Sequence, residues 1–152
     1  MEIRKMEETD IDQVEKIENE IFSMPWTRKD FMDSITNSNQ LYVVAVKENE
    51  VLGYCGLWNV AGEGQITNVA VKKTVRNQKI GFQMLSYLIK WGMQEKITAF
   101  TLEVRESNKP AIHLYKKLGF RAEGLRKNFY EKPKEDAVIM WKYSEDTDIN
   151  YH

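Results

Sequence analysis

The sequence has one cysteine and two histidines, so two common ways of holding a small fold together are missing. The single thiol, Cys55, has no partner for an internal disulfide. A zinc site needs a cluster of cysteine and histidine ligands, and this chain has no such cluster. We therefore expect no disulfide framework and no metal site, and we expect Cys55 to be a small buried apolar residue.

An excess of one charge and long apolar runs are also absent. The formal net charge is −1, which offers no broad surface for nucleic-acid phosphates. The first ten residues are charged, unlike a signal peptide, and no apolar run approaches the length of a membrane span. The sequence therefore predicts a cytoplasmic protein without direct nucleic-acid or membrane binding, although a local acidic patch could still meet a basic peptide.

What the sequence does contain is enough apolar material for one packed domain. Hydrophobic residues make up 42% of the 152 residues and charged residues 30%, which is a globular balance. No internal repeat and no linker to a second domain appears. We expect a single domain over 1–143 and a polar, acidic C-terminal tail over 144–152.

Hydrophobic periodicity and turn residues predict an α/β (α+β) chain. Thr9 is expected to cap a first helix, and Thr27, with Asp30 three residues later, a second helix. The apolar run at 69–71 does not alternate, so either both faces of that strand are covered or a bulge intervenes. The predicted strands are 2–6, 41–46, 51–58, 65–71, 100–104, 120–127 and 137–143, and the later helices are 81–93 and 110–118.

The stretch 102–120, LEVRESNKPAIHLYKKLGF, is the most informative part of the chain. A short strand contains Glu103, Asn108 can cap the next helix, and Gly119 can close it. That helix places Tyr115 on its apolar face. A strand-end carboxylate and an inward tyrosine could form an acid–base pair around one cleft. Alternatively, Glu103 is a solvated strand residue and Tyr115 a core tyrosine bonded to a backbone carbonyl.

A second candidate site follows the strand at 65–71. The loop KKTVRNQKIGF brings four cations, Lys72, Lys73, Arg76 and Lys79, to the start of a helix. Backbone N–H groups and the helix dipole favour an anion at such a position, so a pyrophosphate would fit. An ordinary solvated turn is the alternative.

Both stretches resemble the GCN5-related N-acetyltransferases. The pattern L-E-V-R-x-S-N-x-x-A-x-x-L-Y-x-x-x-G-F at 102–120 is most similar to the bacterial ribosomal-protein alanine N-acetyltransferases, the RimI type. An F-x-x-P-W-[ST] element typical of that type matches Phe22, Pro25, Trp26 and Thr27. The resemblance covers 3–143. It implies a mixed, mostly antiparallel sheet with helices on both faces and a cofactor slot where the fourth and fifth strands splay apart.

The resemblance also implies roles for residues. Glu103 would be the general base and Tyr115 the acid for the departing thiolate of acetyl-coenzyme A. The family's motif [QR]-x-x-G-x-[GA] matches Arg76-x-x-Lys79-x-Gly81, except that Lys79 stands where the first glycine is usual. The implied coenzyme A-binding residues are Val69, Ala70, Val71, Arg76, Asn77, Gln78, Lys79, Ile80, Gly81, Phe82 and Asn108. The implied substrate-binding residues are Trp26, Asn128 and Tyr130.

The resemblance implies acetyl transfer to the N-terminal alanine of the eighteenth small-subunit ribosomal protein, by direct attack in a ternary complex. Two other functions remain open. One is an acetyltransferase for a small amine such as a polyamine or an aminoglycoside. The other is a coenzyme A-binding regulatory module without turnover, which Lys79 in the cofactor loop leaves possible.

Overall fold

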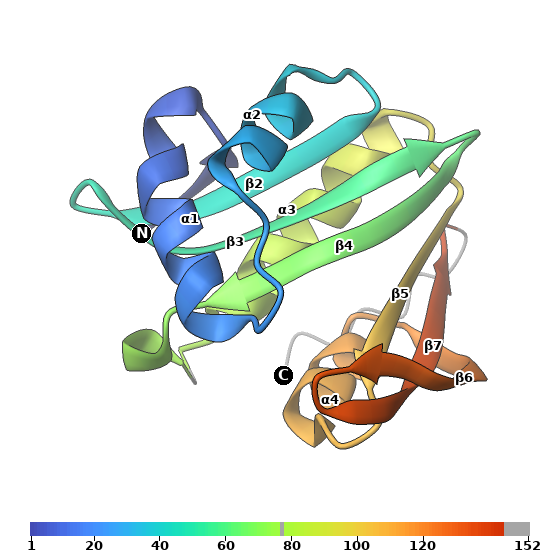
Figure 1. Cartoon of the computed structure of the whole chain (residues 1–152). Coiled ribbons are helices and arrows are strands. Elements are labelled where there is room, and N and C mark those ends of the chain that lie inside the picture. The colour runs from blue at the N-terminus through green and yellow to red at the C-terminus, as the bar shows by residue number, and fades with distance from the viewer. Residues whose placement is uncertain (77, 145–152) are drawn as a thin grey trace.

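The computed structural model describes residues 1–76 and 78–144, so Asn77 and most of the predicted tail lie outside the described residues. The helices and strands follow the predicted order closely (Figure 1). Strands are β1 (Glu2–Lys5), β2 (Gln40–Lys47), β3 (Glu50–Val60), β4 (Glu63–Val71), β5 (Ala99–Arg105), β6 (Arg121–Glu131) and β7 (Lys134–Tyr143). Helices are α1 (Ile11–Ile21), α2 (Arg28–Thr36), α3 (Ile80–Gln94) and α4 (Lys109–Lys117), with short 3₁₀ helices at Glu8–Asp10 and Lys73–Val75.

The strands form one 7-stranded sheet in the order β1-β2-β3-β4-β5-β7-β6. Within the described residues, β4 and β5 are the neighbours that run parallel, and the other neighbouring pairs are antiparallel. Figure 1 shows α1 and α2 on one face of the sheet and α3 on the other. This arrangement confirms the predicted mixed, mostly antiparallel sheet with helices on both faces.

Two apolar clusters hold these layers together. The larger one joins α3 and α4 to the sheet, and Leu88 and Phe100 in it are fully buried. The smaller one joins α1 and α2 to the opposite face, around Ile11, Phe31 and Tyr54. Because each face of the sheet has its own helices, every central strand is covered on both sides over part of its length.

Local sequence signals explain most helix ends. The Thr27 hydroxyl accepts the Asp30 N–H, and the Asn108 side chain accepts the Ala111 N–H, as predicted. The predicted cap at Thr9 is wrong. Thr9 lies inside a 3₁₀ turn that precedes α1, and this turn ends at Asp10, whose carboxylate accepts the Glu7 N–H at 2.8 Å.

A β-bulge lies in β4 just before its apolar end, and both faces of that end are covered, so both of the expected explanations hold. Asn68 pairs with Gly56 and Ile66 with Leu57, so Thr67 is an extra residue on β4. Ile66 packs in the α3-side cluster, whereas Ala70 packs in the α1-side cluster. Residues four apart in a regular strand share a face, so the bulge exchanges the two faces of β4.

The two parallel strands separate after a short paired region. Pairing of β4 with β5 covers Glu63 to Gln65 on one strand and Ala99 to Thr101 on the other. Figure 1 shows β4 and β5 diverging from that shared end. The later half of β4 therefore has β3 on one side and leaves its other backbone edge for a different partner.

Candidate functional site

A cavity of about 600 Å³ opens between the end of β4, the start of α3 and the helix α4. Its wall includes every implied cofactor residue except Asn77, which is outside the described residues, and Gln78. Tyr115 also lines it. The residues that line it are Val69, Ala70, Val71, Val75, Arg76, Lys79, Ile80, Gly81, Phe82, Asn108, Pro110, Ala111, His113, Leu114, Tyr115 and Lys117.

The backbone of β4 presents hydrogen-bond donors on its free edge. The Lys72 N–H donates to the Leu52 carbonyl at 2.8 Å, which turns the backbone of residue 72 toward β3. Backbone direction alternates along a strand, so the N–H groups of Val69 and Val71 point away from β3. These are the groups that could polarise an acyl carbonyl placed between the two strands.

The loop before α3 retains the backbone geometry that the substituted glycine would supply. Lys79 has φ 62° and ψ 18°, in the left-handed region that glycine adopts most easily. The next residues, Ile80 and Gly81, begin the helix with their N–H groups at the cavity. Gly81 is tightly packed, because a Cβ there would lie 3.2 Å from the Leu114 side chain. The lysine therefore changes the charge of the loop while its conformation is kept.

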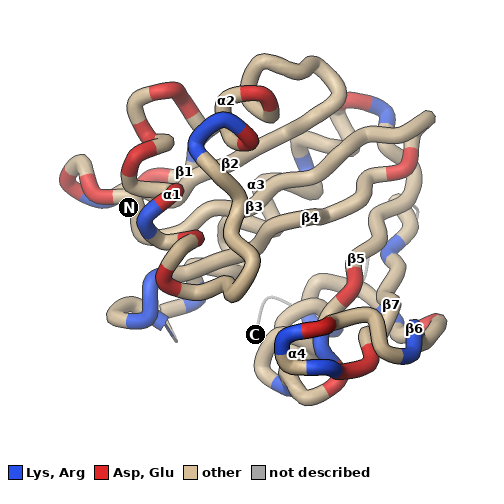
Figure 2. The backbone as a smooth tube through the Cα atoms, viewed as in Figure 1, with Lys and Arg blue, Asp and Glu red and all other residues tan. Residues whose placement is uncertain are grey.

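Not all of the predicted cations are free to meet an anion. Lys72 is paired with Glu50, with 2.6 Å between Nζ and Oε1. Arg76 and Lys79 line the cavity, and the Arg76 Nε donates to the Val71 carbonyl at 3.3 Å. Figure 2 shows Lys and Arg gathered in the loop after β4 and on α4. The mouth of the cavity is therefore basic, which suits a phosphate-bearing ligand.

We expect Lys79→Gly to stabilise the fold and to weaken coenzyme A binding. Removing an L-residue from the left-handed region should raise the free energy of unfolding by up to about 1 kcal/mol. Losing one exposed cation should weaken binding by about 2- to 5-fold.

Chemical denaturation and calorimetric titration measure the two effects of Lys79→Gly. Lys79→Asn is the matched control, because asparagine tolerates the same backbone conformation without a charge. It should show the binding loss with a smaller gain in stability. Tighter binding by the glycine variant would show that the lysine obstructs the loop.

Tyr115 lies in the wall of the cavity. Its side chain is 8% exposed and its ring packs against Phe120, with 6.0 Å between centroids. Within residues 1–76 and 78–144, no hydrogen-bond partner of the hydroxyl is found. Burial raises the pKa of this phenol, so it stays protonated and able to donate. Among the described residues, the Tyr115 hydroxyl therefore does not donate to a backbone carbonyl, as the alternative interpretation expected.

Glu103 lies on the opposite face of β5 from this cavity. Its neighbours Leu102 and Val104 are buried in the α3-side cluster, so Glu103 projects to the other face. Its side chain is 36% exposed, and the Arg126 Nη1 lies 3.4 Å from its Oε1. Glu103 is therefore not part of the cavity wall that includes Tyr115. Its side chain lies on the other face of the sheet, beside the gap between β4 and β5.

The implied substrate residues lie between α1 and α2 and on β6, and Tyr130 interacts electrostatically with Glu103. The Trp26 ring packs on Phe31 and Tyr42, with centroids 5.5 Å and 6.0 Å away. Burial raises the pKa of Tyr130, while the nearby Arg105 opposes this change. Asn128 has φ 56° where the β6–β7 register shifts.

Sequence reasoning missed the contacts that hold the β6–β7 turn. The Arg105 guanidinium lies 4.2 Å from the Tyr130 ring centroid and donates to the carbonyls of Lys132 and Pro133. Hydrogen bonds from Ser107 lower the pKa of Glu135, which also pairs with Arg105 at 3.3 Å. Arg105 is the arginine of the L-E-V-R pattern, and that was the available signal.

A further missed contact links this turn to the α1–α2 loop, the segment 22–27. The Ser23 hydroxyl donates to the Lys132 carbonyl at 3.2 Å. Two segments far apart in sequence therefore meet at the Lys132 carbonyl, which also accepts from Arg105. No sequence signal identified this pair.

The remaining residues of interest have structural positions. Cys55 is fully buried, and burial raises the pKa of its thiol. Among residues 1–76 and 78–144, no three His, Cys, Asp or Glu side chains cluster as metal ligands would. In the same described ranges, no helix has the length and apolar content needed to cross a membrane.

Comparison with known proteins assigns this architecture to a family. Residues 11–120 match the acetyltransferase (GNAT) family. A Haemophilus influenzae [ribosomal protein bS18]-alanine N-acetyltransferase is 31% identical over 146 residues, covering 93% of this chain and 97% of its own. A Bacillus subtilis relative, which carries that name provisionally, is 40% identical over 140 residues. The match covers 91% of this chain and 93% of the relative.

A solved structure agrees with these relatives. The crystal structure of the ribosomal-protein-S18-alanine N-acetyltransferase from Escherichia coli superposes with a TM-score of 0.84 at 28% identity, covering 99% of this chain and 95% of that one. The two diverging strands, the basic loop at the helix start and the Glu103–Tyr115 pair are thus set in a fold shared with an acetyltransferase. The chain is a member of the GNAT family of acetyltransferases.

Proposed function

We propose that this protein transfers the acetyl group of acetyl-coenzyme A to the N-terminal alanine of ribosomal protein bS18. The observation that carries the proposal is the pair of faces at the β4–β5 gap, with a basic cavity on one side and a carboxylate on the other. Relatives of nearly equal length that are named for this reaction support the choice of substrate.

The cavity suits the donor on chemical grounds. Arg76, Lys79 and the first N–H groups of α3 would hold the pyrophosphate, and Asn108 would contact the arm that leads inward. Bound there, acetyl-coenzyme A would supply a thioester that an amine can attack. The N–H groups of Val69 and Val71 would stabilise the oxyanion that develops on its carbonyl.

The acceptor must arrive as a neutral amine on the Glu103 side. An α-amino group has a pKa near 8, so a modest base suffices near neutral pH, whereas a lysine near 10.4 would need more help. Glu103 would take the proton, through a water molecule. Tyr115 would donate a hydrogen bond to the departing thiolate. Full proton transfer from a phenol near pKa 10 to a thiolate near 8.5 is uphill in water, so the hydrogen bond is the minimum role.

The peptide would lie between the α1–α2 loop and the β6–β7 turn. Trp26, Asn128 and Tyr130 would line its path. The Ser23 to Lys132 bond joins the two walls, and the Arg105 contacts hold the β6–β7 turn in place. Because two loops frame the acceptor, a peptide should bind better than a free amine.

The test is a thiol-release assay with a peptide that has the N-terminal sequence of bS18. Mass spectrometry should place the acetyl group on the alanine nitrogen, and a peptide with a blocked N-terminus should be inert. A panel of polyamines, aminoglycosides and free alanine amide tests the small-amine alternative. Faster turnover of a panel member than of the peptide would overturn the proposed substrate. Coenzyme A binding without thiol release from any amine would indicate a regulatory module.

A further inference from the structure

Glu18 is a buried carboxylate to which the reaction above gives no role. It lies on the inner side of α1 and is 2% exposed. In the two described ranges, no lysine, arginine or histidine forms an ion pair with it. A buried carboxylate without a cation is costly unless several donors meet it. The donors that meet Glu18 therefore indicate what it does.

Three donors from three separate segments converge on the Glu18 carboxylate. The Tyr54 hydroxyl of β3 and the Asn68 amide of β4 donate to Oε1, at 2.6 Å and 3.3 Å. The Trp26 backbone N–H, in the α1–α2 loop, donates to Oε2 at 2.9 Å. One side chain thus joins the α1–α2 loop to β4.

The hydrogen bonds continue beyond Asn68 to the β4 bulge. The Asn68 amide nitrogen donates to Glu18, so its oxygen is available and accepts the Tyr42 hydroxyl at 2.9 Å. The Tyr42 hydroxyl has one proton and donates it to Asn68. In its 2.9 Å contact with the Tyr42 oxygen, the Thr67 hydroxyl is therefore the donor. Every donor from Thr67 onward is directed toward Glu18, and such a chain must end on a group that only accepts.

The bulge explains why this chain of hydrogen bonds matters for the site. Thr67 is the extra residue that exchanges the faces of β4, which places Asn68 on the α1 side and within reach of Glu18. The residues that follow, Val69 and Val71, carry the N–H groups directed to the β5 side. The geometry of the bulge therefore sets the donors that face an acyl carbonyl.

We propose that Glu18 is a positioning residue that locks the α1–α2 loop to the β4 bulge. Through its bond to Trp26, Glu18 would hold the α1–α2 loop, which lines the proposed peptide path, in a constant position relative to the N–H groups of Val69 and Val71. This inference rests on the proposed function for its kinetic consequence. The physical link between loop and bulge can be tested without any turnover.

Glu18→Gln is the first variant, because it keeps the shape and replaces one acceptor by a donor. In one orientation its NH₂ group meets the Trp26 N–H, and in the other it meets the Asn68 amide nitrogen. Amide hydrogen exchange in the segments 22–27 and 66–71 should become faster by about 10-fold or more, in both segments together. With an alanine peptide, kcat/KM should fall by about 10²-fold, as misplacement of supporting groups does.

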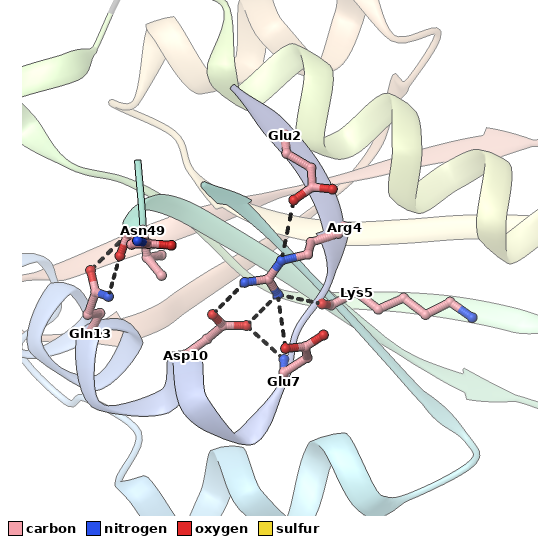
Figure 3. Close-up of polar contacts among 8 residues, drawn as sticks. Glu2, Arg4, Lys5, Glu7, Asp10, Gln13 and Asn49 are labelled. Atoms are coloured by element: carbon pink, nitrogen blue, oxygen red, sulfur yellow. Dashed lines mark hydrogen bonds and ion pairs between the residues drawn. The ribbon is translucent and has the colours of Figure 1, made fainter. Parts of the chain in front are cut away.

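Asp10→Asn is the matched control for loss of a buried carboxylate. Asp10 is 5% exposed, at the other end of α1, and holds Arg4 at 2.7 Å and 2.9 Å (Figure 3). It contacts neither the α1–α2 loop nor β4 in these bonds. Asp10→Asn should lower Tm while exchange in 22–27 and 66–71 and the kinetic constants stay as in the wild type.

The double variant Glu18→Gln/Asn68→Asp exchanges donor and acceptor across the bond. Its glutamine can accept from Trp26 and donate one N–H to the new carboxylate at position 68, and that carboxylate can still accept from Tyr42. The Tyr54 hydroxyl, which donates to Glu18 in the wild type, would accept the second N–H of the glutamine. Slow exchange and most of kcat/KM should return. If Glu18→Gln does not fold, Tyr54→Phe removes one donor only, and a smaller loss of protection in both segments is expected.

A lower Tm for Glu18→Gln with unchanged exchange and unchanged kinetic constants would overturn the inference. So would failure of the double variant to recover protection while remaining folded. A wild type that acetylates no peptide would contradict the proposed function alone, and the exchange experiment would still decide whether Glu18 links the two segments.

Discussion

Replacing Glu103 by glutamine is expected to lower kcat for an alanine peptide by about 10²-fold or more at pH 7. The amide keeps the shape of the side chain and cannot take a proton. Glu103 is partly exposed and its ion pair with Arg126 is at the surface, so little stability should be lost. Steady-state kinetics with the bS18 peptide, together with Tm, measure both effects.

The loss caused by Glu103→Gln should depend on pH in a defined direction. Below the amine pKa of about 8 most of the substrate is protonated, and the base is needed. As the pH rises above that value the free amine becomes abundant, so the ratio of wild-type to variant rates should shrink. Glu106→Gln is the control, since it removes the same charge from an exposed position three residues later. An unchanged rate for Glu103→Gln at pH 7 would leave Glu103 with a structural role only.

The second large effect is expected from Tyr115→Phe, which should reduce kcat by about 10-fold to 10³-fold. The ring and its packing against Phe120 remain, and only the hydroxyl at the cavity is lost. Because no hydrogen bond to that hydroxyl is found in residues 1–76 and 78–144, Tm should change little. Burial raises the pKa of the phenol, so the wild-type hydroxyl remains a donor throughout the neutral range.

Two measurements on Tyr115→Phe decide between its possible roles. Reduced kcat with unchanged Tm supports stabilisation of the leaving thiolate. A loss of about 1–2 kcal/mol in stability with kcat retained would mean that the hydroxyl serves the core, and would remove Tyr115 from the mechanism. Tyr87→Phe is the control, because Tyr87 is exposed on α3 and does not line the cavity.

Local signals in the sequence determined the elements and most of their ends. Helix ends depend on residues next to them in the chain. The caps at Thr27, with Asp30, and at Asn108 and the helix end at Gly119 all lie where they were predicted. The prediction that Thr9 caps the first helix was wrong, because residues 8–10 form a 3₁₀ turn there. Asp10 in this turn also accepts a hydrogen bond from Arg4. That bond joins β1 to the turn before α1, and periodicity cannot report it.

More than half of the residues that line the cavity come from one continuous stretch that the sequence analysis had singled out. Strand, basic loop and helix start follow one another from Val69 to Phe82, so chain connectivity brings them together, whereas tertiary packing adds the α4 side of the wall. The αL conformation of Lys79 is a local property of the same turn. The ion pair of Lys72 with Glu50, which takes this lysine away from an anion, depended on another strand.

The acceptor side was decided by tertiary structure. Glu103 and Tyr115 were expected around one cleft, and it is alternation along β5 that turns Glu103 to the face of the sheet away from the cavity that Tyr115 lines. Arg105, Ser23 and Glu18 each have a hydrogen-bond partner at least 27 positions away in the sequence. The sequence thus determined which chemical groups are present and which backbone segments carry them. Which groups face each other depended on sheet order, the bulge at Thr67 and the separation of two parallel strands, since these follow from packing the whole chain.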